Sequence, residues 1–223
     1  MALSDTKSFK AIIIYNGGSF GDFLKSVSLL GLGEYTDIKI NRSNNTSIEF
    51  GNFKNSLKWL IETSENHSLS KIIENYNNFR VIENSHYYNE DFNNYCSKIF
   101  YIDYPDSFNN VIADRYVDNK ILVDPYLRDY HCNQLVTRIG IKKEKVTDNL
   151  LRLDARITWK KHLNSLREAG IQPIDIKLLF SFETTVKLIE TIIDNKCQKL
   201  DEIKKIWAEW YNVNQEFISK LND

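Results

Sequence analysis

The hydrophobic pattern near the N-terminus predicts a strand, a loop and a helix. The apolar run from Ala11 to Tyr15 is short and rich in β-branched residues, as in a strand that is covered on both faces. The loop after it contains Gly17, Gly18 and Gly21. Apolar residues then recur at helical spacing, at Phe23, Leu24, Val27 and Leu30. We therefore expect a helix to begin where this loop ends.

The rest of the chain alternates further strands and helices. Strands are predicted at residues 36–40, 46–50, 79–82, 98–102 and 171–180. The first two form either a hairpin or an extended excursion beside the glycine loop. Helices are predicted at residues 53–61, 70–76, 91–95, 108–116, 154–169, 181–193 and 200–221. Residues 119–149 show no clear periodicity beyond a short helical stretch at 135–141.

This order of elements predicts an α/β fold. Buried strands that alternate with helices indicate a mainly parallel sheet with helices on both faces, here with a helical C-terminus. No internal repeat or flexible linker divides the chain, so we expect a single α/β domain over residues 1–223. Trp207 and Trp210 share a face of the last helix, and we expect them to pack against this domain.

The ends of the predicted strands point to one site. In parallel sheets, ligands bind at the carboxyl ends of the strands, and residues 16–22, 84–88 and 103–106 follow three predicted strands. The first of these segments is the glycine loop, which leads into a helix N-terminus. Backbone N–H groups in such a place bind phosphate or sulfate. The alternative is a tight turn in which the glycines serve packing alone.

His86 is the best candidate for a catalytic base. Transfer of a sulfuryl or phosphoryl group to a hydroxyl needs a group that accepts the hydroxyl proton, and a histidine suits this near neutral pH. Asp103 or Glu83 would orient the imidazole ring or serve in its place. The alternative is a structural histidine that is hydrogen-bonded at the edge of the core.

The other histidines have less distinctive surroundings. His67 and His162 lie in polar helical stretches, so we expect both in solvent. His131 precedes Cys132, but neighbours in sequence do not make a nucleophilic pair without a defined geometry. The carboxylates show no metal-ligand spacing, so we expect no preformed metal site.

Several tyrosines follow the predicted strand ends: Tyr87, Tyr88, Tyr101, Tyr104 and Tyr126. They would stack on an adenine, a sugar or a nucleobase acceptor. Ordinary packing is the alternative, since 12 Tyr and 12 Phe make the whole chain rich in aromatic residues.

Composition narrows the class of protein. Lys and Arg number 29 against 30 Asp and Glu, a net charge of −1, which argues against a large surface for duplex nucleic acid. The three cysteines include no C-x-x-C pair, so neither a disulfide framework nor a zinc knuckle is predicted. We see no signal-peptide pattern and no apolar run long enough for a membrane span. We expect a cytoplasmic protein without a membrane partner, in the host cytoplasm if it is viral.

The motifs in this order resemble those of the P-loop sulfotransferase-like families, including diverged members often seen in phage and marine bacterial genomes. The first motif is IIIYNGGSFGDFL, which resembles their strand, glycine-rich phosphosulfate-binding loop and helix. The motif NSHYY contains a histidine that is similar to the family's strand-end histidine. The stretch KIFYIDYPDSFNNVIADRY is similar to the strand, turn and helix of the family's 3′-phosphate site. Their late strand and helix are similar to IDIKLLFSFETTVKLIETII, and their terminal helix to WAEWYNVNQEF.

The resemblance implies a P-loop nucleotide transferase-like fold and an activity. A sulfuryl group would move from a nucleotide donor like 3′-phosphoadenosine 5′-phosphosulfate to a hydroxyl of a small molecule or sugar, with His86 accepting the proton. It implies that the donor binds to the loop residues Gly17, Gly18, Ser19, Phe20, Gly21 and Asp22. Arg115 would contact the donor's phosphate, with Arg42, Lys25 and Lys120 as alternatives.

Two other functions stay open. The first is a nucleotide-dependent kinase for a nucleoside or modified nucleobase, which would use ATP and Mg²⁺. Lys25 and Ser26 come several residues after Gly21, however, unlike the lysine and hydroxyl of the G-x-x-x-x-G-K-[ST] loop. The second is a catalytically inactive binding or virion-associated protein. The absence of a loop lysine and the anions Asp22 and Asp103 favour this last function.

Overall fold

The computed structural model of the chain describes residues 9–34, 38–41, 47–50, 57, 60–61, 68–75 and 81–221. Within these residues, four parallel strands form the main sheet, in the order β4-β1-β5-β6. They are β1 (Phe9–Ile14), β4 (Ile82–Ser85), β5 (Cys96–Asp103) and β6 (Gln172–Asp175). A separate antiparallel pair consists of β2 (Ile38–Asn41) and β3 (Ser47–Phe50). The predicted hairpin and the predicted α/β fold with a mainly parallel sheet are thus confirmed.

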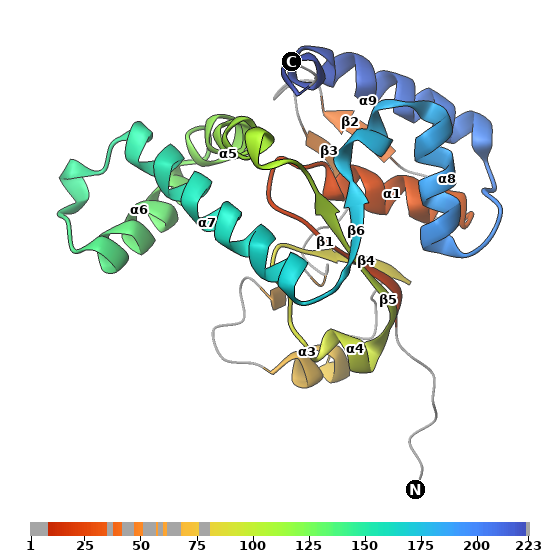
Figure 1. Ribbon diagram of the computed structural model, residues 1–223, viewed down its shortest axis with the longest axis horizontal. Coiled ribbons are helices and arrows are strands. Elements are labelled where there is room, and N and C mark those ends of the chain that lie inside the picture. Colours follow the sequence, from red (N-terminus) through yellow and green to blue (C-terminus); the bar gives the residue numbers. More distant parts are fainter. Residues whose placement is uncertain are drawn as a thin grey trace, which may run out of the picture.

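The described helices form three groups around the sheet. The described helices are α1 (Gly21–Gly31), α3 (Leu69–Asn75), α4 (Phe92–Tyr95), α5 (Asn109–Tyr116), α6 (Pro125–Ile139), α7 (Asp148–Glu168), α8 (Phe182–Ile193) and α9 (Leu200–Lys220). In Figure 1, α1, α8 and α9 lie together at one side of the strands, and α3 and α4 lie at the opposite side. Helices α5, α6 and α7 form the third group, which extends away from the sheet.

Most predicted elements are present. The strand at 98–102 lies within β5, the helix at 154–169 coincides with most of α7, and the last two helices are α8 and α9. Gly170 follows α7 with φ of +67°, the left-handed conformation that favours glycine at this place. Helix α3 begins at Leu69, one residue before the predicted start of the helix at 70–76. The predicted helix at 53–61 lies outside the described residues, except for Leu57, Leu60 and Ile61, which are helical.

The region predicted to be irregular is mostly helical. In place of a short helix at 135–141, the chain forms a π-helical turn (Val117–Ile121) and then the fifteen-residue α6. Asp124 caps α6 by accepting hydrogen bonds from the N–H groups of Tyr126 and Leu127, and Gly140 ends it. The apolar periodicity is weak because only Cys132 and Leu135 of α6 are buried. The capping residues were the better signal.

Two predicted strands have different limits. The strand predicted at 79–82 is β4, which begins at Ile82 and continues through the polar residues Glu83, Asn84 and Ser85. The strand predicted at 171–180 ends at Asp175, whose side chain accepts a hydrogen bond from the N–H of Lys177. This contact turns the chain into a 3₁₀ helix (Ile176–Phe180). Alternation alone did not distinguish the two conformations.

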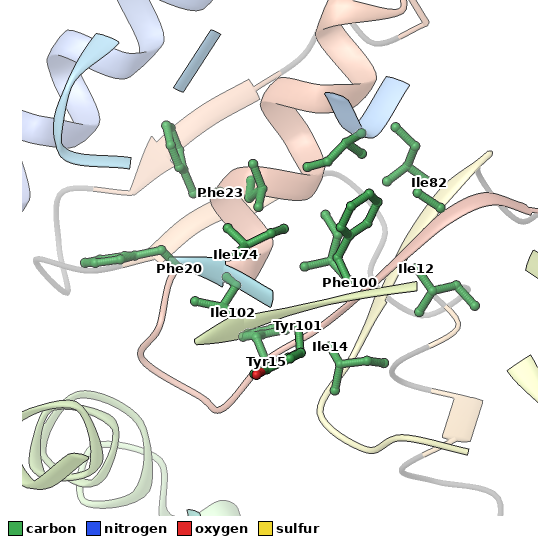
Figure 2. Packing of buried hydrophobic residues seen from close by; sticks show 14 of the residues in the cluster. Ile12, Ile14, Tyr15, Phe20, Phe23, Ile82, Phe100, Tyr101, Ile102 and Ile174 are labelled. Carbon is green, nitrogen blue, oxygen red and sulfur yellow. The ribbon is translucent and has the colours of Figure 1, made fainter. Parts of the chain in front are cut away.

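The hydrophobic core follows this division. The larger cluster joins the strands to α1, α8 and α9, and Figure 2 shows Phe23, Phe100 and Ile174 gathered within it. Trp210 stacks on Phe23 with ring centroids 4.1 Å apart, and Trp207 Nε1 donates to the carbonyl of Leu179. The expected packing role of both tryptophans is confirmed. A smaller cluster lies among α5, the π-helical turn, α6 and α7.

Candidate functional site

The ends of three strands meet at one edge of the sheet. Ile14 pairs with Ser85 of β4 and with Tyr101 of β5, and the N–H of Tyr15 donates to the carbonyl of Ser85. The glycine loop after β1, the segment after β4 and the segment after β5 therefore begin side by side. This is the arrangement expected from the rule that sites form at carboxyl ends of parallel strands.

The glycines of the loop are packed against neighbouring groups. A side chain at Gly17 would begin 2.5 Å from the ring of Tyr116, and one at Gly18 would begin 2.9 Å from the carbonyl oxygen of Ile112. Gly21 lies against the ring of Tyr15 in the same way. Gly18 also has φ of +86°. Close packing and a left-handed turn are thus sufficient to explain why glycine stands at these positions. This agrees with the alternative of a tight turn in which the glycines serve packing alone.

Ser19 and Phe20, two predicted donor-binding residues, point into the protein. Ser19 is buried, and its hydroxyl donates to the carbonyl of Asn16 at 2.5 Å. Phe20 is left-handed, with φ of +68°, and its ring packs edge-on against Trp210 and Phe217. Neither residue lines the cavity that lies between the sheet edge and helices α5, α6 and α7.

Arg115 lies on the same inner side as Phe20. Its guanidinium is 4.4 Å from the ring centroid of Phe20 and 4.1 Å from that of Phe217, and Nη2 donates to Asn214. Burial lowers the pKa of Arg115 to about 9. These contacts resemble cation–π packing rather than an exposed phosphate ligand. Of the alternatives to Arg115, Arg42 lies outside the described residues.

The charged residues at the start of α1 are engaged. The carboxylate of Asp22 accepts a hydrogen bond from the amide of Asn84 at 2.8 Å. Lys25 forms a 2.5 Å ion pair with Glu83 of β4, whose side chain is 1% exposed. The hydroxyl of Ser26 donates to the carbonyl of Asp22. The loop and its helix therefore bind the neighbouring strand β4.

Asp103 joins the sheet to α7. Its carboxylate accepts hydrogen bonds from Arg167 at 2.8 Å and from the N–H of Tyr104. Arg167 also binds Asp106, and this contact holds the pKa of Asp106 below its usual range. Asp103 does not line the cavity that contains His86. Its predicted role beside His86 is therefore not supported by its position.

A cavity of about 180 Å³ lies between the sheet edge and the group formed by α5, α6 and α7. Its walls include three histidines, and we call it the three-histidine cavity. The lining of the cavity includes Asn16, Gly17, His86, Tyr87, Tyr116, Tyr130, His131, Gln134, Arg138, Asp154, Ala155, Thr158, Trp159 and His162. Of the residues predicted for the site, Gly17 and His86 lie here.

His86 reaches the cavity from the end of β4. A turn follows the strand, because the hydroxyl of Ser85 accepts a hydrogen bond from the N–H of Tyr87. The ring of His86 packs edge-on against Tyr15, with centroids 4.6 Å apart, and faces Tyr116 at 6.4 Å. The strand end and two aromatic rings thus position the imidazole.

His162 is held in one tautomer by Asn16. The amide nitrogen of Asn16 donates to the carbonyl of Trp159 and to the hydroxyl of Tyr104, so its oxygen faces Nδ1 of His162 at 2.8 Å. An amide oxygen only accepts hydrogen bonds, so Nδ1 carries the proton and Nε2 carries the lone pair. Nε2 is buried without a hydrogen-bond partner within the described ranges. It is a buried proton acceptor that the described part of the chain leaves unused.

The surroundings of His162 keep the ring neutral. Burial lowers its pKa to about 4, and the neighbouring His86 adds to this effect. The expectation that His162 lies in solvent was wrong, because the polar helix face on which it lies turns toward the sheet edge.

The charged side chains of the cavity neutralise each other. Arg138 of α6 binds Asp154 of α7 through two hydrogen bonds of 2.7 and 3.1 Å, and Nη1 of Arg138 also donates to Thr158. A bidentate pair of this kind is stronger than a single contact. The wall therefore presents an ion pair with no net charge.

Sequence reasoning missed the part of the cavity that α6 and α7 supply. His131, Gln134 and Arg138 follow one another at helical spacing on α6, and Asp154, Thr158 and His162 do so on α7. Two polar stripes on adjacent helices were the signal that could have revealed them. The predicted tyrosines divide between roles: Tyr87 lines the cavity, Tyr104 is buried beneath Asn16, and Tyr126 is 78% exposed.

Comparisons of the chain with protein-family models, with curated proteins and with solved structures find no match. The sulfotransferase-like resemblance thus stays a hypothesis carried by the sequence motifs. Among the described residues, no helix combines the length and apolar character that a membrane crossing needs. Nor does that part of the chain bring three His, Cys, Asp or Glu side chains together as metal ligands.

Proposed function

We propose that the protein is a sulfotransferase-like group-transfer enzyme whose acceptor binds in the three-histidine cavity. The observation that supports this best is that the cavity joins Gly17, at the start of the glycine loop, to His86, at the end of the adjacent strand. A donor group and a proton acceptor would then lie on opposite sides of one bound hydroxyl. Such placement is the main contribution of an enzyme to in-line transfer.

In the proposed reaction, the donor's sulfuryl group lies against backbone N–H groups near Gly17 and Gly18. The acceptor oxygen forms a bond to sulfur as the bond from sulfur to the donor phosphate breaks, and His86 takes the hydroxyl proton. Because the loop contains no lysine, the N–H dipoles carry the stabilisation of the developing charge. His162 remains neutral beside His86. The imidazole that accepts the proton therefore has an uncharged neighbour.

A binding protein without catalysis is the second candidate. It is favoured by the packing of the loop and of the start of α1, where Ser19, Asp22 and Lys25 all have partners within the protein. The kinase alternative has less support. Lys25 is paired with Glu83, and the hydroxyl of Ser26 is used inside the helix, so neither is placed like the lysine or the magnesium ligand of a phosphotransferase loop.

Thermal denaturation with nucleotides separates these candidates. Adenosine 3′,5′-bisphosphate, ATP with Mg²⁺, AMP and buffer alone are compared at equal concentrations. A ligand at 100 times its Kd stabilises by about 2.7 kcal/mol, and we expect this only with the bisphosphate. A shift with ATP and Mg²⁺ alone would favour the kinase. No shift with any nucleotide would remove both enzymes and leave the binding protein.

The role of His86 needs a second measurement. With His86→Gln, we expect the bisphosphate shift to persist while turnover of the sulfate donor, with a pool of hydroxyl compounds as acceptors, falls about 100-fold. His67→Gln is the control, because His67 is not part of the proposed machinery. Equal turnover in the two variants would exclude His86 as the base.

A further inference from the structure

We infer that the three-histidine cavity selects an uncharged, hydroxyl-bearing molecule of the size of one ring and rejects its anionic analogues. The inference deepens the proposed function. It rests on that proposal only in treating the bound molecule as the acceptor. Selection by size and charge is a property of the cavity itself, and it can be measured without a donor.

The volume sets the size of the ligand. Pockets for drug-sized ligands span about 300–1,000 Å³, whereas a cavity of about 150 Å³ in another protein holds a benzene molecule. At about 180 Å³, this cavity encloses one aromatic or sugar ring. A nucleotide donor is larger, so it cannot share the enclosed space with an acceptor. The donor's nucleoside must lie elsewhere.

The walls favour a ring over an extended chain. Tyr116 lies 5.0 Å from Trp159 and 6.2 Å from His131, measured between ring centroids, with the planes inclined by 54° and 82°. Rings at such angles form a corner that a flat molecule contacts with both a face and an edge. Tyr87 and Tyr130 are 57% and 47% exposed and stand where the ligand meets solvent.

The electrostatics exclude an anion. Arg138 is neutralised by Asp154, and His162 is uncharged because its pKa is about 4. The other titratable side chains of the wall are His86, His131, Tyr87, Tyr116 and Tyr130. Among the described lining residues, Arg138 is the only arginine or lysine. A carboxylate or phosphate would thus lose its hydration without gaining a free cation, which is unfavourable.

Polar groups on the walls favour a ligand with hydroxyl groups. Gln134 and Thr158 offer amide and hydroxyl groups. A ligand hydroxyl both donates and accepts hydrogen bonds, so it can match each of these groups.

Matched probes test the inference at pH 8 by ligand-detected NMR titration of the whole chain. Benzyl alcohol is compared with benzoate, and glucose with glucuronate. We expect the neutral member of at least one pair to bind at least tenfold more tightly than its anion. The pair that shows this distinguishes an aromatic from a sugar ligand. Equal or tighter binding of the anions, or no binding of either neutral probe, would overturn the inference.

Two variants tie the binding to the cavity. Ala155→Leu fills the space from α7 and should abolish probe binding, whereas Ala208→Leu, on the exposed face of α9, should not. Asp154→Asn frees the guanidinium of Arg138, so benzoate or glucuronate should bind about tenfold more tightly than to the natural protein. Unchanged binding with Ala155→Leu, or no gain for the anions with Asp154→Asn, would refute the inference.

The outcomes also separate this inference from the proposed function. Selective probe binding without a nucleotide shift leaves the cavity inference intact and removes the transferase. A thermal shift with the bisphosphate but no probe binding would leave the transferase proposal intact and refute the cavity inference.

Discussion

The glycine loop and the three-histidine cavity lie next to each other but use their polar groups differently. In the loop and the start of α1, Ser19, Asp22 and Lys25 all form contacts with neighbouring residues. The glycines allow the rings of Tyr15 and Tyr116 to pack closely. His162 lines the cavity, and no described residue uses its buried Nε2 as a hydrogen-bond acceptor. The motif that stands out in the sequence is therefore the better packed region, and the chemically available groups lie mainly on helices.

This difference revises the role of the glycine loop. A glycine-rich turn before a helix is a familiar anion-binding arrangement, yet close approach of neighbouring atoms also requires glycine. Here that approach comes from α5 through Ile112 and Tyr116. The loop therefore supports the cavity by holding Asn16 beneath His162, whether or not a donor binds to its N–H groups.

The largest effect is expected from Lys25→Met. The change removes the partner of the buried Glu83 carboxylate, and a broken buried ion pair costs about 3–5 kcal/mol of unfolding free energy. The double variant Lys25→Met/Glu83→Gln should recover most of the loss, because no buried charge is left unpaired. Urea denaturation of both variants gives the values. A loss below 1 kcal/mol for Lys25→Met would show that Lys25 is available for a ligand and that the loop is not closed.

The next effect concerns pH. The pKa of His162 is about 4 in the folded protein, against 6.5 for an unperturbed histidine, so the unfolded chain binds the proton more readily. The contribution of His162 to the free energy of unfolding is complete above pH 6.5. It is lost as the pH falls toward 4, and the total loss is about 3 kcal/mol.

Urea denaturation between pH 7 and 4 tests this effect. We expect a smaller loss of stability over this interval in His162→Gln than in the natural protein. His131→Gln serves as the comparison, since it removes another histidine from the same cavity. Parallel pH curves for His162→Gln and the natural protein would show that His162 is not buried as a neutral ring, and the contrast between the two regions would disappear.

A smaller effect isolates the packing of the loop. Gly18 and Gly140 both have positive φ, at +86° and +69°, but only Gly18 lies close to another group among the described residues. Alanine at Gly140 should cost about 1 kcal/mol for the left-handed conformation alone. Alanine at Gly18 should cost about 2–3 kcal/mol, since the side chain also meets the carbonyl of Ile112. Equal losses in chemical denaturation would mean that the loop has room for a bound group.

Much of the fold could be predicted because its signals are local. The apolar run of β1, the larger part of α7 and the helix α8 could be predicted from the period of their hydrophobic residues. Helix α6 was missed because its surface-exposed side chains carry little apolar periodicity, although Asp124 and Gly140 marked its ends. Strand β4 was displaced because its buried residues are polar, and their burial depends on partners such as Lys25.

The sequence by itself determined the strand, glycine loop and helix at the N-terminus, the parallel α/β arrangement and the position of His86 after a strand. Only the tertiary structure decided what surrounds them. His162 is 146 residues from Asn16 along the chain, and no local pattern reveals that α7 brings them together. Periodicity specifies which face of an element is buried, but the neighbours that meet there are fixed by long-range packing. For this reason the scaffold was predictable, whereas the cavity and its second buried histidine were not.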